Sequence, residues 1–275
     1  MTGCELENRV AVVTGGASGI GRATAILLAR QGARVFVGDL RPSASDEGLF
    51  RELGIVQSTC DVRSEAGLRA LIDEAAERGG RLDILVSNAG IGLVKQIAEV
   101  TEEDWSACMD TNLKSAFFGA KHAIRHMRQT GGGAIVNTAS NAGLLPRAHD
   151  PVYSISKLAL VGLTKSLALC HAPDRVRVNC VCPGPVGDTR MMEDDLDQAP
   201  DRAAAERERI EASPLAAAFD RMIAPEEVAR AILYLVSDAA CMVTGTAIAI
   251  DGGKSLGVPP RTVQSSKHQG QSTLP

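Results

Sequence analysis

The strongest constraint on the fold is a regular alternation of short apolar strand patterns and amphipathic helical patterns. The strand patterns lie at residues 10–14, 33–38, 55–60, 82–87, 133–138, 175–181 and 246–250. Helical patterns lie between them at 19–31, 45–53, 64–78, 101–129, 152–171 and 225–236. Strands that alternate with helices form right-handed βαβ units, whose parallel sheet is covered on both faces. We therefore predict an α/β fold with a doubly wound, seven-stranded parallel sheet.

The alternation has no linker and no internal repeat, which predicts a single domain over residues 1–255. A chain of 275 residues can bury a substantial core in one such domain. Residues 187–224 form a long insertion after a strand, with a helical run near 201–212, and we predict a substrate lid there. Its acidic residues 193–197 are interpreted as a solvated face. The polar residues 256–275 are predicted to be a C-terminal tail.

Composition excludes several classes of protein. The net charge is −4, with 45% apolar and 23% charged residues, and there is no basic stripe. Nucleic acid or an anionic membrane surface is therefore not expected as a partner. The first residues lack the apolar stretch of a secretory signal, and no uncharged run approaches transmembrane length. Seven scattered cysteines and five dispersed histidines match no metal pattern. We expect a cytoplasmic protein with reduced thiols and no metal.

A glycine-rich turn follows the first strand. Residues 14–21 read Thr-Gly-Gly-Ala-Ser-Gly-Ile-Gly. Gly15, Gly19 and Gly21 would let the backbone turn tightly and approach a pyrophosphate at the start of the first helix, where N–H groups and the helix dipole favour anions. Between the first strand and first helix of a βαβ run, the pattern predicts dinucleotide binding.

Asp39 bears on the choice of dinucleotide. It ends the second strand, eighteen residues after Gly21, where a carboxylate can accept both adenosine ribose hydroxyls. A 2′-phosphate at this position would be repelled, so Asp39 favours NAD over NADP. Arg41 lies two residues further on and leaves NADP open.

Tyr153 and Lys157 are four residues apart on a predicted helix and would share one face. A cation beside a phenol favours the phenolate and moves the phenol pKa from about 10 towards neutrality. Such a pair suits general acid–base chemistry. Taken alone, the pair favours a surface tyrosine and a solvated lysine at chance spacing, so its meaning depends on the rest of the chain.

The motifs taken together resemble the short-chain dehydrogenase/reductase family over residues 8–253, with a single Rossmann-type domain. They are the glycine-rich turn at 14–21, Asp61-Val62, Asn88-Ala89-Gly90, Asn112, Ser140, Tyr153-x-x-x-Lys157, Pro183-Gly184 and Asp251-Gly252-Gly253. Ser140 lies thirteen residues before Tyr153, as the family requires.

The resemblance implies four catalytic residues. Tyr153 would be the general acid/base, and Lys157 would lower its pKa and bind the nicotinamide ribose. Ser140 would hydrogen-bond the reacting oxygen. Asn112 would bind a water that connects Lys157 to solvent, although an asparagine near a helix end can also be a packing residue.

The resemblance also implies a set of cofactor contacts. Asp61 and Val62 would border the adenine, and Pro183, Gly184 and Val186 would contact the nicotinamide end. The full predicted set is Gly15, Ser18, Gly19, Ile20, Gly21, Asp39, Leu40, Asp61, Val62, Asn88, Ala89, Gly90, Tyr153, Lys157, Pro183, Gly184, Val186 and Thr189. The chain has Asp188 where the family has the threonine of Pro-Gly-x-Val/Ile-x-Thr, so either Thr189 or Asp188 could reach the nicotinamide carboxamide.

The predicted function is hydride transfer between NAD(H) and a small-molecule secondary alcohol or ketone. Candidate pocket residues suggest a mainly apolar pocket: Leu93, Val94, Asn141, Ala142, Leu144, Met191 and Met192. One alternative is an NADPH-dependent ketoreductase of the 3-oxoacyl carrier-protein reductase kind. Another is a non-catalytic dinucleotide-sensing protein on the same fold, although Ser140, Tyr153 and Lys157 are all present. By analogy with the family we expect a homotetramer that packs helices 101–129 and 152–171 against partners.

Overall fold

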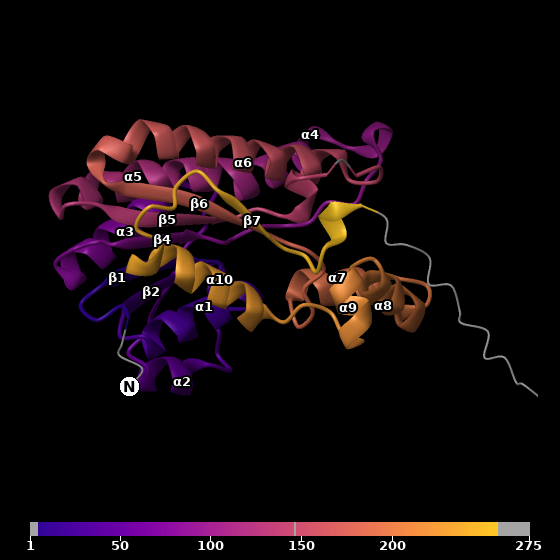
Figure 1. Ribbon diagram of the computed structural model, residues 1–275, viewed down its shortest axis with the longest axis horizontal. Coiled ribbons are helices and arrows are strands. Elements are labelled where there is room, and N and C mark those ends of the chain that lie inside the picture. Colours follow the sequence, from indigo (N-terminus) through magenta and orange to yellow (C-terminus); the bar gives the residue numbers. More distant parts are fainter. Residues whose placement is uncertain (1–4, 146, 258–275) are drawn as a thin grey trace, which may run out of the picture.

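A computed structural model describes residues 5–145 and 147–257 of the chain. Seven parallel strands form one sheet in the order β3-β2-β1-β4-β5-β6-β7 (Figure 1), as the sequence predicts. The strands are β1 (Val10–Thr14), β2 (Arg34–Asp39), β3 (Val56–Thr59), β4 (Ile84–Ser87), β5 (Gly133–Thr138), β6 (Val176–Pro183) and β7 (Ala247–Ile250). The order reverses between β1 and β4, which places the switch point of a doubly wound sheet at their carboxyl ends.

Helices cover both faces of the sheet. They are α1 (Gly19–Arg30), α2 (Glu47–Glu52), α3 (Glu65–Gly79), α4 (Glu102–Met109), α5 (Ser115–Gln129), α6 (Pro151–His171), α7 (Arg190–Asp197), α8 (Arg202–Glu211), α9 (Pro214–Phe219) and α10 (Pro225–Val236). Figure 1 shows α5 and α6 above the sheet and α1 and α10 below it, and α3 packs with α5 on the same face. The predicted lid contains three helices, α7 to α9, where the sequence indicated one helical run. Most of the predicted tail, from residue 258 on, lies outside the described residues.

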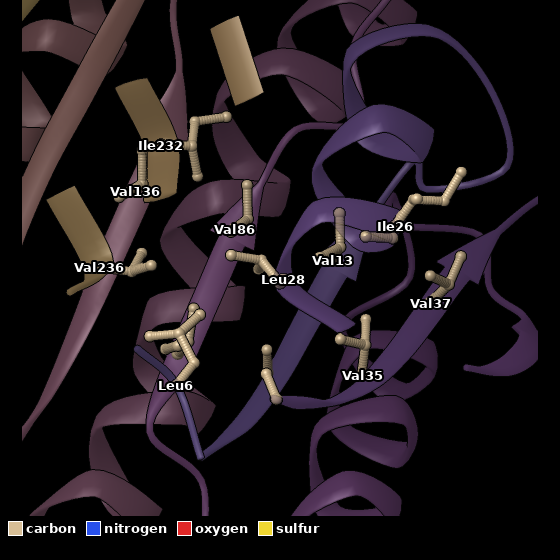
Figure 2. Packing of buried hydrophobic residues seen from close by; sticks show 14 of the residues in the cluster. Leu6, Val13, Ile26, Leu28, Val35, Val37, Val86, Val136, Ile232 and Val236 are labelled. Atoms are coloured by element: carbon tan, nitrogen blue, oxygen red, sulfur yellow. The ribbon is translucent and has the colours of Figure 1, made fainter. Parts of the chain in front are cut away.

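Successive side chains of each strand point to opposite faces of the sheet, so the core is divided between the two faces. Figure 2 shows one face, where Val13, Val86 and Val136 of the strands meet Leu28 of α1 and Ile232 of α10. On the other face, the register aligns Val12, Phe36, Leu85 and Ile135 from four adjacent strands, and these residues pack with α3 and α5. Strands buried on both faces have no polar side, which explains their continuous apolar sequences.

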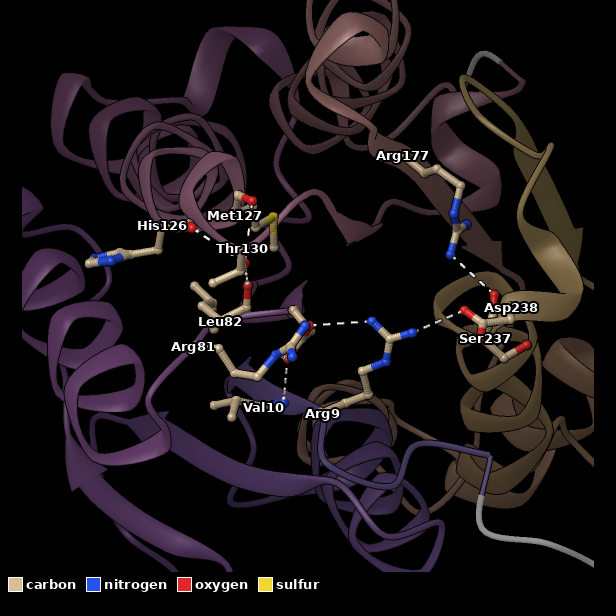
Figure 3. Close-up of polar contacts among 11 residues, drawn as sticks. Arg9, Val10, Arg81, Leu82, His126, Met127, Thr130, Arg177, Ser237 and Asp238 are labelled. Atoms are coloured by element: carbon tan, nitrogen blue, oxygen red, sulfur yellow. Dashed lines mark hydrogen bonds and ion pairs between the residues drawn. The ribbon is translucent and has the colours of Figure 1, made fainter.

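The amino ends of the strands are closed by ion pairs (Figure 3). Asp83, which is buried, accepts hydrogen bonds from the Val10 N–H at 2.9 Å and from Arg81 at 2.6 and 2.8 Å. Arg9 lies between Asp83 and Asp238 at 3.4 and 3.3 Å. A cavity of about 180 Å³ lies among these side chains. The carboxyl ends of the strands, at the opposite edge, are left to carry the candidate site.

One segment in the described residues, Pro151–Asp174, is long and apolar enough by length and composition to span a membrane. It consists of α6 and the turn η4 (Ala172–Asp174), and its mean hydropathy is 1.3. In the fold it packs against β6 and buries Lys157 and Thr164. Core helices of a folded domain commonly have this composition, and α6 is one of them.

Candidate active site

The turn between β1 and α1 has a backbone that requires glycine. Gly15 and Gly19 have φ angles of 64° and 52°. A Cβ atom on Gly15 would lie 2.8 Å from the Cα of Ala89, and one on Gly21 would lie 2.1 Å from the carbonyl oxygen of Gly15. Ser18, which precedes α1, makes no capping hydrogen bond, so the first N–H groups of the helix have no side-chain cap. These groups are suited to bind an anion.

Asn88 connects the turn to the ends of two neighbouring strands. Its Nδ2 donates to the carbonyl oxygens of Thr14 and Gly15 at 3.1 and 3.2 Å. Its Oδ1 accepts from the Thr138 hydroxyl at 3.3 Å. The predicted cofactor residues Asn88, Ala89 and Gly90 therefore lie beside the glycine-rich turn, with the Asn88 side chain bracing the turn.

Asp39 lies at the opposite side of the same turn. Its two carboxylate oxygens accept from the backbone N–H groups of Ala17 and Arg41, both at 3.2 Å. Leu40 is exposed and Val62 is buried. Asp61 pairs with Arg63 at 2.7 Å, and hydrogen bonds from Arg63 hold the pKa of Asp61 below its usual value.

A cavity of about 560 Å³ opens over the start of α1, and its lining includes Ser18, Gly19, Arg41, Ser43 and Arg190. Free helix N–H groups and cationic side chains favour a phosphate-bearing ligand here. Arg22, also in the lining, is held by Asp46 at 2.6 and 2.8 Å. The close-packed glycine backbone and this cavity together fit a dinucleotide cofactor.

The segment after β6 closes the other end of this cleft. Gly184 is packed so closely that a Cβ atom there would lie 2.9 Å from the Cα of Asp251, and Val186 is buried. Thr189 lies against the glycine-rich turn, since its Cγ2 would be 3.0 Å from a Cβ atom on Gly19. Asp188 is exposed, with φ of 52°. Of the two candidates, Thr189 is therefore the residue directed towards the cofactor cleft.

Helix α6 places Tyr153 and Lys157 beside the end of β5. Lys157 is buried, and its Nζ donates to the carbonyl oxygen of Thr138 at 2.9 Å. The same Nζ lies 5.8 Å from the centroid of the half-buried Tyr153 ring. Ser140 follows β5 and is buried, with its Oγ 3.1 Å from the backbone N–H of Ala142. The three residues that the sequence pairs by spacing are thus brought together at the carboxyl edge of the sheet.

Burial controls the protonation of this pair. Loss of solvent lowers the pKa of Lys157 to about 8. Loss of solvent also raises the pKa of Tyr153, and a hydrogen bond with Ser140 and the charge of Arg147 only partly oppose that rise. The spacing in the sequence predicts a lowered pKa for Tyr153, because it reveals the nearby lysine but not the burial of the phenol. That prediction is wrong for this structure.

Asn112 lies in a wide helical turn, η2 (Asp110–Lys114), which has π-helical geometry and joins α4 to α5. Its Oδ1 accepts from the Ile91 N–H at 2.8 Å, and its Nδ2 lies 3.0 Å from the Ile91 carbonyl and 3.1 Å from the Ser156 hydroxyl. A Cβ atom on Gly90 would lie 3.1 Å from Asn112 Oδ1 and 3.3 Å from Lys157 Nζ. Asn112 therefore packs beside the lysine, and its amide is engaged by Ile91 and Ser156.

Several residues of the site were not found from the sequence. The Thr138 carbonyl that binds Lys157 is a backbone group without a sequence signal. Ser156 lies inside the Tyr-x-x-x-Lys motif and accepts a hydrogen bond from Asn112. Helical spacing could have indicated which face of the helix carries Ser156. Arg147 lies with its guanidinium carbon 5.8 Å from the Tyr153 ring centroid, and no spacing rule indicates it. Of the predicted pocket residues, Asn141 and Ala142 are buried, whereas Val94, Leu144 and Met191 are exposed.

Comparisons with known proteins agree with this arrangement. A family model described as enoyl-(acyl carrier protein) reductase matches residues 15–255. The cis-4-hydroxycyclohexanecarboxylate dehydrogenase of Sinomonas cyclohexanicum is 41% identical over 249 residues, which cover 89% of this chain and 96% of that protein. The 3-oxoacyl-[acyl-carrier-protein] reductase of Thermotoga maritima is 36% identical, with 90% and 98% of the two chains covered. The chain belongs to the short-chain dehydrogenase/reductase family.

A solved structure of the family shows the same fold. The ligand-free aldohexose dehydrogenase of Thermoplasma acidophilum superimposes with a TM-score of 0.85 at 31% identity, covering 94% of this chain and 98% of that one. Membership makes the chain an oxidoreductase of the short-chain dehydrogenase/reductase family that uses a nicotinamide cofactor, NAD or NADP. Within the described residues, no group of three or more His, Cys, Asp or Glu side chains could hold a metal ion.

The burial of Lys157 predicts a stability cost at the site. In the folded protein its pKa is about 8, below the ordinary 10.5, so protonated Lys157 opposes folding. The destabilisation by protonated Lys157 is complete below pH 8, declines between pH 8 and 10.5 and is absent above that range. The difference between the two pKa values corresponds to roughly 3 kcal/mol. We expect Lys157→Met to raise the free energy of unfolding at pH 7 by about 1–3 kcal/mol.

Urea unfolding of the wild type and Lys157→Met at several pH values measures this effect. The advantage of the variant should shrink between pH 8 and 10.5. Lys165→Met, which changes an exposed lysine on the same helix, serves as the control and should show no such trend. Equal stability of the wild type and Lys157→Met at pH 7 would contradict the interpretation.

Proposed function

We propose that the chain is an NAD-dependent dehydrogenase that interconverts a secondary alcohol and its ketone. The observation that carries the proposal is the grouping of Tyr153, Lys157 and Ser140 beside a glycine-rich turn suited to a dinucleotide. The nicotinamide, when bound, accepts or supplies the hydride. The protein supplies the acid–base group and the orientation of the reacting carbon.

Tyr153 is the proton-transferring group in this proposal. In oxidation, its phenolate oxygen takes the hydroxyl proton of the alcohol, and in reduction the phenol returns a proton to the carbonyl oxygen. Ser140, at the end of β5, donates a hydrogen bond to the same substrate oxygen and stabilises the charge that develops on it. Lys157 supplies the cation beside the tyrosine, and Asn112, which lies with it around Gly90, connects it towards the half-exposed Ile91.

The preference for NAD rests on Asp39. Its carboxylate is fixed by two backbone N–H groups at the end of β2, where an adenosine ribose is bound in this type of fold. A fixed carboxylate accepts hydrogen bonds from ribose hydroxyls and repels a 2′-phosphate. Arg22, one of the cations nearby, is already neutralised by Asp46.

We expect NADH to give a higher kcat/KM than NADPH in ketone reduction. Asp39→Ser should lower the ratio of the two kcat/KM values by about tenfold or more. Initial rates with both cofactors measure the effect. Glu52→Ser is the control, because Glu52 is an exposed carboxylate on α2 that does not line this cavity. A strong NADPH preference in the wild type would overturn the NAD assignment and favour the carrier-protein ketoreductase alternative.

Removal of the phenol hydroxyl tests the catalytic assignment. Tyr153→Phe should reduce turnover by at least about 10³-fold, because the proton-transferring group is lost, while the dissociation constant for NADH stays within about threefold. Tyr234→Phe, at the only other tyrosine of the chain, should retain wild-type turnover. Near-normal activity of Tyr153→Phe would refute the catalytic role of Tyr153, whereas a wild type without turnover on any alcohol or ketone would favour the non-catalytic sensor.

The substrate class is proposed from the relatives. The 41% identical dehydrogenase is named for a ring alcohol that carries a carboxylate, and we propose a cyclic secondary alcohol for this chain as well. A suitable panel contains cis- and trans-4-hydroxycyclohexanecarboxylate, their carboxamides, cyclohexanol and a 3-oxoacyl thioester. The absorbance of the reduced nicotinamide reports turnover of each. Helices α7 to α9 are proposed to be the lid over this substrate.

We also propose that the protein is a homotetramer. The helices α4, α5 and α6 expose several large apolar side chains to the surroundings: Trp105, Phe117, Ile155, Leu158 and Leu169. Leu158 and Leu169 are 61% and 81% exposed. An apolar surface of this kind is typical of a contact between subunits.

Light scattering at micromolar concentration should give the mass of four chains. Leu158→Glu should reduce the mass to that of a smaller species, because a charge buried in an apolar contact is costly. Phe219→Glu, which changes an exposed aromatic residue on α9, should leave the mass unchanged. A monomeric wild type would exclude the tetramer.

A further inference from the structure

A group of arginines lines the cavity at the amino edge of the sheet, opposite the candidate active site. The cavity measures about 180 Å³, and its four arginines come from the starts of three strands: Arg9 before β1, Arg81 before β4, and Arg175 and Arg177 at the beginning of β6. Strands β1, β4, β5 and β6 are adjacent in the sheet, so their amino ends lie side by side. The topology therefore brings side chains from distant parts of the chain to one cavity.

Positive charge exceeds negative charge in this cavity. Asp83 and Asp238 are the two carboxylates among its described lining residues. The buried Asp83 lies 2.6 Å from Arg81 and 3.4 Å from Arg9 (Figure 3). Arg9 also lies 3.3 Å from Asp238. Four guanidinium groups and two carboxylates leave an excess of two positive charges, which an anion would offset.

Arg177 is a half-buried cation whose hydrogen-bond partners are neutral. It donates to the carbonyl oxygens of Leu235 and Ser237 at the end of α10, at 2.6 and 3.2 Å (Figure 3). In the part of the chain that the structure describes, no carboxylate lies at ion-pair distance from Arg177. Burial lowers the pKa of Arg177, whereas the hydrogen bonds with Asp83 raise the pKa of Arg81. The charge of Arg177 is therefore less compensated than that of Arg81.

Arg175 is an exposed cation on the lining of the same cavity. The carboxylate nearest to it in the chain, Asp174, pairs instead with Arg128 and His171 at 2.8 and 2.9 Å. The backbone carbonyl of Arg175 accepts from the Gly133 N–H at 3.2 Å. This bond places Arg175 beside the glycine segment that precedes β5, between the starts of β4 and β6.

The cavity has room for a small anion. A Cβ atom at Gly131, in its lining, would have no other atom within 4 Å. The volume of about 180 Å³ equals that of about six water molecules in the liquid and lies below the roughly 300–1,000 Å³ of pockets for drug-sized ligands. A phosphate group suits this size, whereas a second dinucleotide is too large.

The arginines keep N–H donors for such a group. Among the described contacts, Arg9, Arg81 and Arg177 each use two of the five N–H groups of a guanidinium. The planar fork of a guanidinium matches the oxygens of phosphate, and such charge-assisted bonds are about twice as strong as neutral ones.

We propose that this cavity binds the phosphate group of inorganic phosphate or of a small phosphomonoester. We call it the amino-edge site, formed by Arg9, Arg81, Arg175 and Arg177. Phosphate there joins the starts of β1, β4 and β6 through their arginines, and it stabilises the folded domain because it binds the folded chain and not the unfolded one. The site lies at the edge of the sheet opposite the cofactor cleft, so it is independent of the proposed hydride transfer.

Titration calorimetry with inorganic phosphate at constant ionic strength, with NADH present to occupy the cofactor cleft, tests the site. We expect saturable binding to the wild type. Arg175→Gln and Arg177→Gln should each weaken it about tenfold, because each removes a cationic donor. Since Arg175 is exposed, Arg175→Gln should fold even if Arg177→Gln does not. Arg30→Gln, at an exposed arginine that ends α1, should keep the affinity of the wild type.

The cofactor cleft also attracts phosphate, so a variant there is the second control. Arg190→Gln, which changes a cation of that cleft, should leave the phosphate affinity measured with NADH unchanged. Absence of saturable binding to the wild type, or weaker binding by Arg190→Gln but not by Arg175→Gln, would overturn the amino-edge site.

The same titration with glycerol 3-phosphate separates the two sources of the phosphate group. Tighter binding of the ester than of inorganic phosphate, with the same loss in Arg175→Gln, would support the site and assign it to a phosphomonoester. The reverse order would support the site and assign it to free phosphate. An equal affinity of Arg175→Gln and the wild type for both compounds would refute the proposal.

Discussion

A buried ammonium group with one carbonyl partner is the interaction on which the catalytic half of the molecule depends. The buried side chain of Lys157 extends from α6 to the Thr138 carbonyl at the end of β5. On the other side, a Cβ atom at position 90 would lie 3.3 Å from Lys157 Nζ, so a residue larger than glycine there would crowd the lysine. The bond to the Thr138 carbonyl joins the Lys157 end of α6, close to Tyr153, to the end of β5. A domain selected for stability alone would not bury this charge.

The sheet and its edge were predictable because they follow from local chemistry. The alternation of Val12 and Val13 between two cores, and of their neighbours in the adjacent strands, determines which face each helix covers. Parallel strands end at one edge, so residues that directly follow β1, β2, β4 and β5 had to converge there. Asp39, Asn88 and Ser140 are such residues, and the structure brings them to that edge.

The remaining features depend on burial and on contacts between distant segments, which no spacing in the chain records. Arg147 lies against the Tyr153 ring from the loop before α6, where the buried Asp150 holds it, and no spacing rule indicates that contact. The direction of the Tyr153 pKa depends on how much solvent the fold removes. The range of α8 was obscured for a third reason, since this helix buries none of its residues and its sequence has weak apolar periodicity.

The wide turn at η2 has a consequence for how this site can vary among related chains. A π-helical turn is equivalent to one residue inserted into an α-helix, and each inserted residue rotates the following helix by about 100°. The insertion leaves α4 facing α6 and α5 facing α3 within one continuous run of helix. Loss of this single residue would rotate α5 by about 100° relative to α4, so that Ala120 and Ala123 could no longer pack in the core shared with α3 while α4 kept its contact with α6. The position of Asn112 is therefore tied to the packing of α5 and cannot vary independently of it.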